Sequence, residues 1–355
     1  MIEIERKSFA KFSFENKANL ILSIKSFLEK KIIKNPRTQG EIFFNEYINK
    51  ISNFSQNGKC FRGLLLLYFY ELLSGKKYDE NEIHIACAIE LLQSGLLIHD
   101  DIIDKDETRR GNPTFFASYR DNANFYGIKK DTDLFGNNIA ICGGDSAFFM
   151  AYESILLAKN IDIARFFTNE AQKTIYGEFL DSLYGMSSFE ISKEDIYNIY
   201  YNKTARYTFS LPIGCSCILS NLNENETFDL MEIGSLFGIL FQIKDDLNGI
   251  IGKEEEIGKP IGSDMKENKK TLLRYFLINK IDKNISKEEI YSLLGNKDAK
   301  DEDIKKYISI LEKTGAMADM KSYIINLENK IKLDIINKIK KESLCDFFNE
   351  LLNIL

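Results

Sequence analysis

Proline is scarce in this chain, with four prolines among 355 residues. Because a proline inside a helix removes a hydrogen bond and clashes with the preceding turn, this scarcity permits long uninterrupted helices. Apolar residues also recur at helical spacing, as at Ile83, Ala86, Cys87 and Leu91. The sequence therefore predicts an all-α protein.

The apolar periodicity predicts several long helices joined by short turns. Residues 106–135 are polar and predict a long loop, of a length typical of a functional lid. No repeat or low-complexity linker separates two halves, so we predict a single domain over residues 1–355. The expected helices cover residues 58–74, 80–104, a stretch begun or interrupted at 143–145 and ending near 158, 162–185, 193–219 and 227–249, with smaller amphipathic helices in the last eighty residues.

Composition excludes several classes of protein. The net charge is −6 and no basic stripe is present, which argues against a nucleic-acid partner. No eighteen consecutive residues are apolar, so we expect no membrane insertion. The N-terminus lacks the layout of a signal peptide, and the six cysteines suit buried positions in a reducing compartment. We therefore expect a cytoplasmic protein.

The first of two acidic clusters follows a long apolar segment and reads Asp100-Asp101-Ile102-Ile103-Asp104. Asp100 and Asp104 share a helix face, where like charges repel. Such a cluster suits a hard cation, because Mg²⁺ prefers oxygen ligands and binds one or two carboxylates together with phosphate oxygens. The arginines that follow, Arg109 and Arg110, match phosphate geometry.

The second cluster is Asp245-Asp246, followed by Lys259, Asp264 and Lys269-Lys270. Alone, a pair of aspartates is usually a solvated helix end, and a pair of arginines is usually surface. Two separated acidic clusters, each followed by cations, form a much rarer combination. Together they indicate binding of a metal ion and a phosphorylated substrate.

The order and spacing of these motifs resemble the trans-prenyl diphosphate synthases, the family of farnesyl and geranylgeranyl diphosphate synthases. The resemblance covers about residues 57–275. The matching elements are Gly58-Lys59-Cys60-Phe61-Arg62, the segment from Gln93 to Asp101, Lys203-Thr204, the segment from Phe241 to Asp246, the segment from Gly258 to Asp264, and Lys269-Lys270-Thr271.

The resemblance implies a helical bundle around a central cavity, usually homodimeric, that joins isopentenyl diphosphate head to tail to an allylic diphosphate with Mg²⁺. It implies roles for individual residues as well. The metal would be held by Asp100, Asp101, Asp104, Asp245 and Asp246. The allylic diphosphate would be bound by Arg109, Lys203 and Lys259, with Lys269 also binding substrate, and the isopentenyl diphosphate would be bound by Lys59, Arg62, Gln93 and Arg110. Thr204 and Gln242 would face the reacting carbons.

Product length is expected to depend on Gly95 and Leu96, five and four residues before the first aspartate. A glycine inside a helix costs roughly 0.5–1 kcal/mol relative to alanine. An open cavity beside Gly95 would explain this glycine and allow a product of twenty carbons or more, which a phenylalanine at position 95 would shorten. Close helix packing at Gly95 is the alternative, and a shorter farnesyl product also stays open.

Two other functions remain as alternatives. A class I terpene cyclase also uses an aspartate-rich motif, but its second motif needs a hydroxyl and an acid where this chain has Gly249 and Lys253. A non-catalytic partner subunit of another synthase would tend to lose the aspartates. The family's fifth-position aspartate in the second motif is Gly249 here, and the basic tail of some farnesyl synthases is absent.

Overall fold

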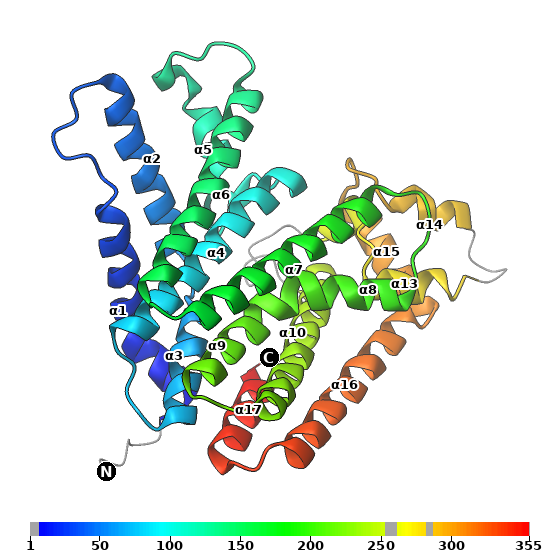
Figure 1. Ribbon diagram of the computed structural model, residues 1–355. Coiled ribbons are helices and arrows are strands. Elements are labelled where there is room, and N and C mark those ends of the chain that lie inside the picture. The colour runs from blue at the N-terminus through cyan, green and yellow to red at the C-terminus, as the bar shows by residue number, and fades with distance from the viewer. Residues whose placement is uncertain (1–6, 253–260, 282–286, 355) are drawn as a thin grey trace. The chain divides into compact units, whose positions relative to one another are not determined.

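The computed structural model describes residues 7–252, 261–281 and 287–354 and confirms the all-α prediction. The chain divides into two compact units, Met1–Ala171 with Leu211–Phe228, and Gln172–Ser210 with Asp229–Leu355. The boundaries fall inside two helices and at one helix junction (Figure 1). We predicted a single domain; the structure divides the chain into two compact units, and the chain passes between them three times.

Unit 1 contains the helices of the N-terminal half and one two-stranded antiparallel hairpin. Figure 1 shows α4, α5 and α6 side by side within it. Its elements are α1 (Phe9–Glu29), α2 (Gln39–Gln56), α3 (Phe61–Ser74), α4 (Glu80–Asp104), β1 (Thr108–Arg109), β2 (Asn112–Pro113), α5 (Phe115–Asp121), η1 (Ala123–Tyr126), α6 (Thr132–Leu157) and α9 (Leu211–Leu219).

Unit 2 contains the C-terminal helices, and two helices are shared between the units. Its core includes Phe237, which stacks on Phe348 with ring centroids 5.5 Å apart. The shared helices are α7 (Ile161–Met186) and α10 (Glu224–Ile251); the others are α8 (Lys193–Ile199), η2 (Tyr200–Ser210), α12 (Ser263–Lys266), α13 (Leu272–Ile278), α14 (Lys287–Leu293), α15 (Asp301–Lys313), α16 (Ala316–Lys338) and α17 (Glu342–Ile354).

The helix that carries the first acidic cluster, α4, has the predicted bounds. Asp79 caps its N-terminus and forms a capping box with Glu82, and the helix ends where Lys105 adopts a left-handed conformation. These local signals and the long apolar face indicate the same start and end of the helix. The aspartates therefore stand at the C-terminal end of a well-defined helix.

The prediction of a long, lid-like loop over residues 106–135 is wrong. The segment forms the β1–β2 hairpin, α5, η1 and the first turn of α6. Its average polarity hid a short apolar stretch, because Phe115, Phe116 and Tyr119 are all buried in the core of unit 1. The hairpin is the part of this segment that positions a candidate site residue.

The predicted helix over 193–219 consists of three consecutive segments, α8, η2 and α9, and η2 is a π-helix. Two neighbouring helices touch its backbone. A β-carbon at Gly177 of α7 would lie 2.2 Å from the Lys203 nitrogen, and one at Gly238 of α10 would lie 2.4 Å from the Ala205 Cα. Only glycine allows this approach.

Candidate active site

At the first cluster, an arginine joins three carboxylates in unit 1. The β1–β2 hairpin carries Arg109, whose Nε donates to Asp101 Oδ1 at 2.6 Å. Its Nη2 donates to Asp100 Oδ2 at 3.2 Å and lies 3.6 Å from Asp106 Oδ2. Asp104 is half-buried one turn further along α4. Asp106 is a carboxylate of this group that the sequence reasoning missed.

Asp101 is the buried member of the cluster, with a side chain that is 0% exposed. Its Oδ2 atom has no hydrogen-bond partner among the described residues. Burial raises the pKa of Asp101 to about 7, although Arg109 acts in the opposite direction. A buried carboxylate oxygen without a partner is costly, so this atom is suited to an additional cationic ligand.

The acidic residues provide the oxygen donors that Mg²⁺ or Ca²⁺ prefers. Within the described part of the chain, no three His, Cys, Asp or Glu side chains are already arranged to hold a metal ion. The partnerless Asp101 oxygen is the structural observation in favour of such a cation.

The residues expected to bind isopentenyl diphosphate gather around the start of α3. Arg62 is half-buried in its first turn, and Gln93 is half-buried on α4. Glu90 accepts a hydrogen bond from the Gly63 nitrogen at 2.7 Å. Burial raises the pKa of Glu90, and nearby Arg62 and Arg110 oppose that rise. This buried acid was not found from the sequence.

Lys59 is placed differently from the prediction. The predicted helix over residues 58–74 would include Lys59, but α3 begins at Phe61, and Lys59 lies before it and is exposed. Cys60 has a left-handed conformation, with φ of 52°, which separates Lys59 from the helix. Arg110 is nearby, since its Nη1 would lie 3.2 Å from a β-carbon on Gly58.

In the second cluster, on α10, the two aspartates have different environments. Asp245 is exposed, whereas Asp246 is buried. The Tyr200 hydroxyl donates to Asp246 Oδ2, and the Gln242 amide donates to Asp246 Oδ1 at 2.7 Å. Burial raises the pKa of Asp246 well above its usual value, and Asp264 adds to the rise.

Two further hydrogen bonds extend this network. The Thr204 hydroxyl donates to Gln242 Oε1 at 2.7 Å, so both residues expected near the reacting carbons are in contact. The Tyr200 hydroxyl also accepts from the Leu272 nitrogen at 2.9 Å. Tyr200 therefore links α10 to the segment that carries Lys269 and Lys270, a role that no sequence motif indicated.

Lys203 is held by two acids of α7, at 3.0 Å from Glu178 Oε2 and 2.6 Å from Asp181 Oδ2. These acids stand three residues apart on one helix, which was the only signal in the sequence that could have found them. Lys269 lies 3.3 Å from Glu267 Oε2. Lys259 lies outside the described residues.

Gly249, where the family's second motif has an aspartate, lies beside the carboxylate of Asp264. A β-carbon at Gly249 would lie 3.7 Å from Asp264 Oδ2. A carboxylate from another segment therefore lies beside the position where the motif lacks one. Asp264 is a candidate for the outer part of this acidic site.

The prediction of an open cavity at Gly95 is wrong, and the packing alternative holds. A β-carbon there would lie 2.6 Å from the Phe148 ring and 2.9 Å from the Gly144 carbonyl oxygen of α6. Gly144 in turn faces His99, which would lie 2.2 Å from a β-carbon at position 144. The two glycines let α4 and α6 interlock. Leu96, on the next position of α4, is half-buried.

The polyprenyl synthetase family profile matches residues 45–311 of this chain. The chain is 30% identical to a short chain isoprenyl diphosphate synthase of Methanocaldococcus jannaschii over 298 residues, covering 82% of this chain and 84% of that protein. It is also 30% identical to a geranylgeranyl diphosphate synthase of Saccharolobus solfataricus over 334 residues, covering 85% and 94%.

A solved structure is similar along almost the whole chain. It is the crystal structure of geranylgeranyl pyrophosphate synthase from Corynebacterium glutamicum complexed with isoprenyl diphosphate and magnesium. The TM-score is 0.84 at 25% sequence identity, and the match covers 95% of this chain and 96% of that chain. The sequence matches and the structural match thus agree.

Proposed function

The chain belongs to the polyprenyl synthetase family, and we propose that its two acidic clusters serve to bind Mg²⁺ and the allylic diphosphate. The reaction is the head-to-tail condensation of isopentenyl diphosphate with an allylic diphosphate, which gives a trans-polyprenyl diphosphate. The protein is thus a prenyltransferase. The observation that carries the metal proposal is the buried Asp101 oxygen without a hydrogen-bond partner.

The difficult step of this reaction is ionisation of the allylic carbon–oxygen bond, which leaves a carbocation and a diphosphate. Mg²⁺ would act as a Lewis acid and a template on the leaving diphosphate. We assign Asp100, Asp104 and Asp245 to direct contact with the metal. The partnerless Oδ2 of buried Asp101 is assigned to the same cation, and buried Asp246 orients its neighbour Asp245.

Arg109 and Lys203 are the protein cations for the allylic diphosphate. In the described structure both are paired with carboxylates, Arg109 with Asp100 and Asp101, and Lys203 with Glu178 and Asp181. We propose that these carboxylates keep the cations in position until a diphosphate displaces part of the contacts. Lys259 and Lys269 are assigned to the same substrate.

The isopentenyl diphosphate is assigned to Lys59, Arg62, Gln93 and Arg110. The N-terminus of α3 adds backbone N–H groups, which favour an anion. Glu90 accepts from the Gly63 nitrogen and so fixes the first turn of this helix. The condensation ends with loss of a proton, for which the released diphosphate is the acceptor, since no described side chain here is an evident base.

Thr204 and Gln242 are assigned to the reacting carbons. Their mutual hydrogen bond orients both side chains, and Gln242 is fixed further by Asp246. Oriented hydroxyl and amide dipoles can stabilise the positive charge that develops on ionisation. The π-helix η2 places Thr204 next to Lys203, so one segment provides a cation for the leaving group and a dipole for the carbocation.

We propose a product of twenty carbons or more. Relatives that resemble this chain include a geranylgeranyl diphosphate synthase, which supports that length. Because Phe148 packs directly on Gly95, Phe148 and the half-buried Leu96 are the candidates for the residues that stop the growing chain. Phe148 replaces Gly95 as the residue to test for product length.

We propose a homodimer that works in the cytoplasm. Four exposed apolar residues form a stripe along α6: Leu134, Ile141, Phe149 and Leu156. Among the described residues, α6 is the one helix long and apolar enough to cross a membrane, a test that core helices of soluble proteins also pass. A second copy of the chain would cover this stripe.

Light scattering on the purified chain tests the dimer. Phe149→Asp should yield monomers, and Phe14→Asp, at an 87% exposed position on α1, should leave the wild-type mass unchanged. Equal masses for both variants and wild type would refute the α6 interface.

An activity assay of the purified chain separates the candidate functions. Supplied with isopentenyl diphosphate, an allylic diphosphate and Mg²⁺, a synthase gives a longer diphosphate. A terpene cyclase would release a hydrocarbon, and a non-catalytic partner subunit would give neither. Chromatography of the products against standards of fifteen, twenty and twenty-five carbons also reads out the product length.

A further inference from the structure

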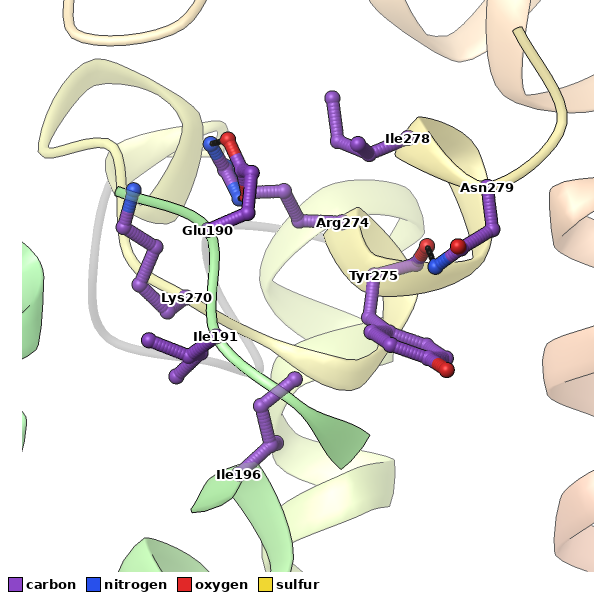
Figure 2. A pocket seen from close by; sticks show the side chains of 8 residues that line it. All are labelled: Glu190, Ile191, Ile196, Lys270, Arg274, Tyr275, Ile278 and Asn279. Atoms are coloured by element: carbon purple, nitrogen blue, oxygen red, sulfur yellow. Dashed lines mark hydrogen bonds and ion pairs between the residues drawn. The ribbon is translucent and has the colours of Figure 1, made fainter. Parts of the chain in front are cut away.

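Unit 2 contains a pocket that the proposed reaction does not use. It lies between the segment joining α7 to α8, the start of α8, and α13 with the residues flanking it, and has a volume of about 100 Å³. Figure 2 shows three charged side chains, Lys270, Arg274 and Glu190, on one side of it, with Tyr275 and Asn279 on the other. Isoleucines form much of the remaining wall.

Arg274 and Glu190 form a satisfied ion pair in this pocket. The Arg274 side chain is 3% exposed. Its Nη2 donates to Glu190 Oε1 at 2.7 Å, its Nη1 donates to Glu190 Oε2, and its Nε donates to Asn268 Oδ1 at 3.1 Å. The Tyr291 hydroxyl also donates to Glu190 Oε1, at 3.1 Å. The two charges therefore cancel.

Lys270 differs because it has no such partner. It is 5% exposed, and it makes no hydrogen bond or ion pair with any described residue. Burial lowers the pKa of Lys270 and Arg274 lowers it further, while the Glu190 carboxylate, already paired with Arg274, opposes both effects. The Lys270 Nζ is not among the fully buried polar atoms without a partner, so the ammonium stays accessible to water or to a ligand in the pocket. The pocket thus has one uncompensated positive charge.

We propose that this pocket binds a small oxyanion, a carboxylate or a phosphate group, on Lys270. Since one water needs about 10–15 Å³ of such space, a pocket of about 100 Å³ accepts a small group and not a prenyl chain. Ile191, Ile196 and Ile278 form the apolar part of the lining, and Tyr275 and Asn279 lie on the other side of the pocket from Lys270. An anion in this recess is partly shielded from water, which strengthens its attraction to Lys270.

The bound anion would act on the candidate active site through one short segment. Lys270 lies between Lys269, assigned to substrate, and Leu272, whose nitrogen donates to Tyr200. Tyr200 in turn donates to Asp246 of the second cluster. An anion that shifts Lys270 therefore shifts a hydrogen-bonded path to the acidic site. This regulatory consequence rests on the proposed function, whereas the binding of the anion does not.

Thermal denaturation and calorimetry test the binding with two probes, inorganic phosphate and acetate. Wild type should bind at least one probe and gain stability as its concentration rises. Lys270→Met should lose that binding tenfold or more and be at least as stable without anion, while Lys270→Arg should keep it. Lys297→Met, which changes an exposed lysine of unit 2, is the matched control and should behave as wild type.

The outcomes separate the pocket from the proposed reaction. If both probes bind wild type and Lys270→Met with equal affinity, or neither binds wild type at tens of millimolar, the pocket proposal is overturned. Stronger binding of phosphate or of acetate identifies the head group. In the condensation assay, the favoured anion should change kcat or KM of wild type and not of Lys270→Met. A wild type that binds the anion but makes no prenyl product would overturn the proposed function alone.

Discussion

The two acidic clusters place a buried aspartate beside an accessible one, but they hold the buried aspartate in different ways. Asp101 on α4 is paired with a cation, Arg109. Asp246 on α10 is held by neutral donors, the Tyr200 hydroxyl and the Gln242 amide. A cation that is itself assigned to substrate can change partners when a diphosphate binds. A neutral network keeps its geometry and acts as a fixed support.

The largest expected effect tests whether both clusters do the same chemistry despite this difference. Asp100→Ala and Asp245→Ala should each lower kcat by on the order of 10³, because each removes a metal contact at the leaving group. Steady-state assays at saturating Mg²⁺ measure this. Asp298→Ala, at an exposed aspartate of unit 2, is the control. Near-native turnover in either variant would show that its cluster is not catalytic.

The fixed support of the second cluster is tested by Tyr200→Phe, which removes one hydroxyl. The variant leaves Asp246 with one donor fewer and the Leu272 nitrogen without its acceptor. Loss of such an outer partner typically costs about 10–100-fold in metal affinity or activity. The readout is the Mg²⁺ concentration for half-maximal rate, which should rise. Tyr201→Phe, on the neighbouring residue, should leave it unchanged; an equal rise in both variants would count against the network.

The assignment of the two substrates to different residues gives a smaller effect. Arg62→Ala should raise the KM for isopentenyl diphosphate by about tenfold, the order expected when a hydrogen bond to a charged group is lost. The KM for the allylic diphosphate should change little. Lys203→Ala should raise the KM for the allylic diphosphate and change the KM for isopentenyl diphosphate little. If Arg62→Ala raised both KM values equally, the two subsites would be assigned wrongly.

Local sequence signals were sufficient where structure is locally determined. The apolar period predicted the bounds of α4, which the Asp79–Glu82 capping box fixes at the N-terminus, and the motif order indicated the family. Features that depend on a distant neighbour were not accessible. The π-helix η2 depends on two glycines of other helices, and the ion pairs of Lys203 depend on α7.

The failure at Gly95 has the same physical origin. Its helix position was predicted correctly, but the sequence could not show which atoms of α6 lie opposite. The segment 115–119 was missed because averaging over thirty polar residues concealed a few buried aromatic residues. In both cases the identity of the residue was visible and its packing partner was not.

The smallest effect concerns the packing that supports the first cluster. Gly95→Ala puts a methyl group against the Phe148 ring. Overpacking costs typically about 1–3 kcal/mol, and a cost in this range is expected here because the Phe148 ring and the Gly144 carbonyl oxygen lie 2.6 and 2.9 Å from the added carbon. Phe148→Ala in the same chain should relieve the part of this cost that comes from the ring, so the two substitutions should be non-additive, which denaturant unfolding of the single and double variants measures.

The same pair of residues links this packing to product length. Phe148→Ala alone removes the ring that lies on Gly95, so the main product should become longer while the first condensations proceed at near wild-type rate. Adding Gly95→Phe to Phe148→Ala returns a ring to the same place from α4 and should bring the product back toward the wild-type length. Phe14→Ala, at an exposed phenylalanine of α1, is the control for loss of an aromatic ring. A folded Phe148→Ala enzyme with an unchanged product distribution would mean that Phe148 only joins α4 to α6, and that the floor lies elsewhere.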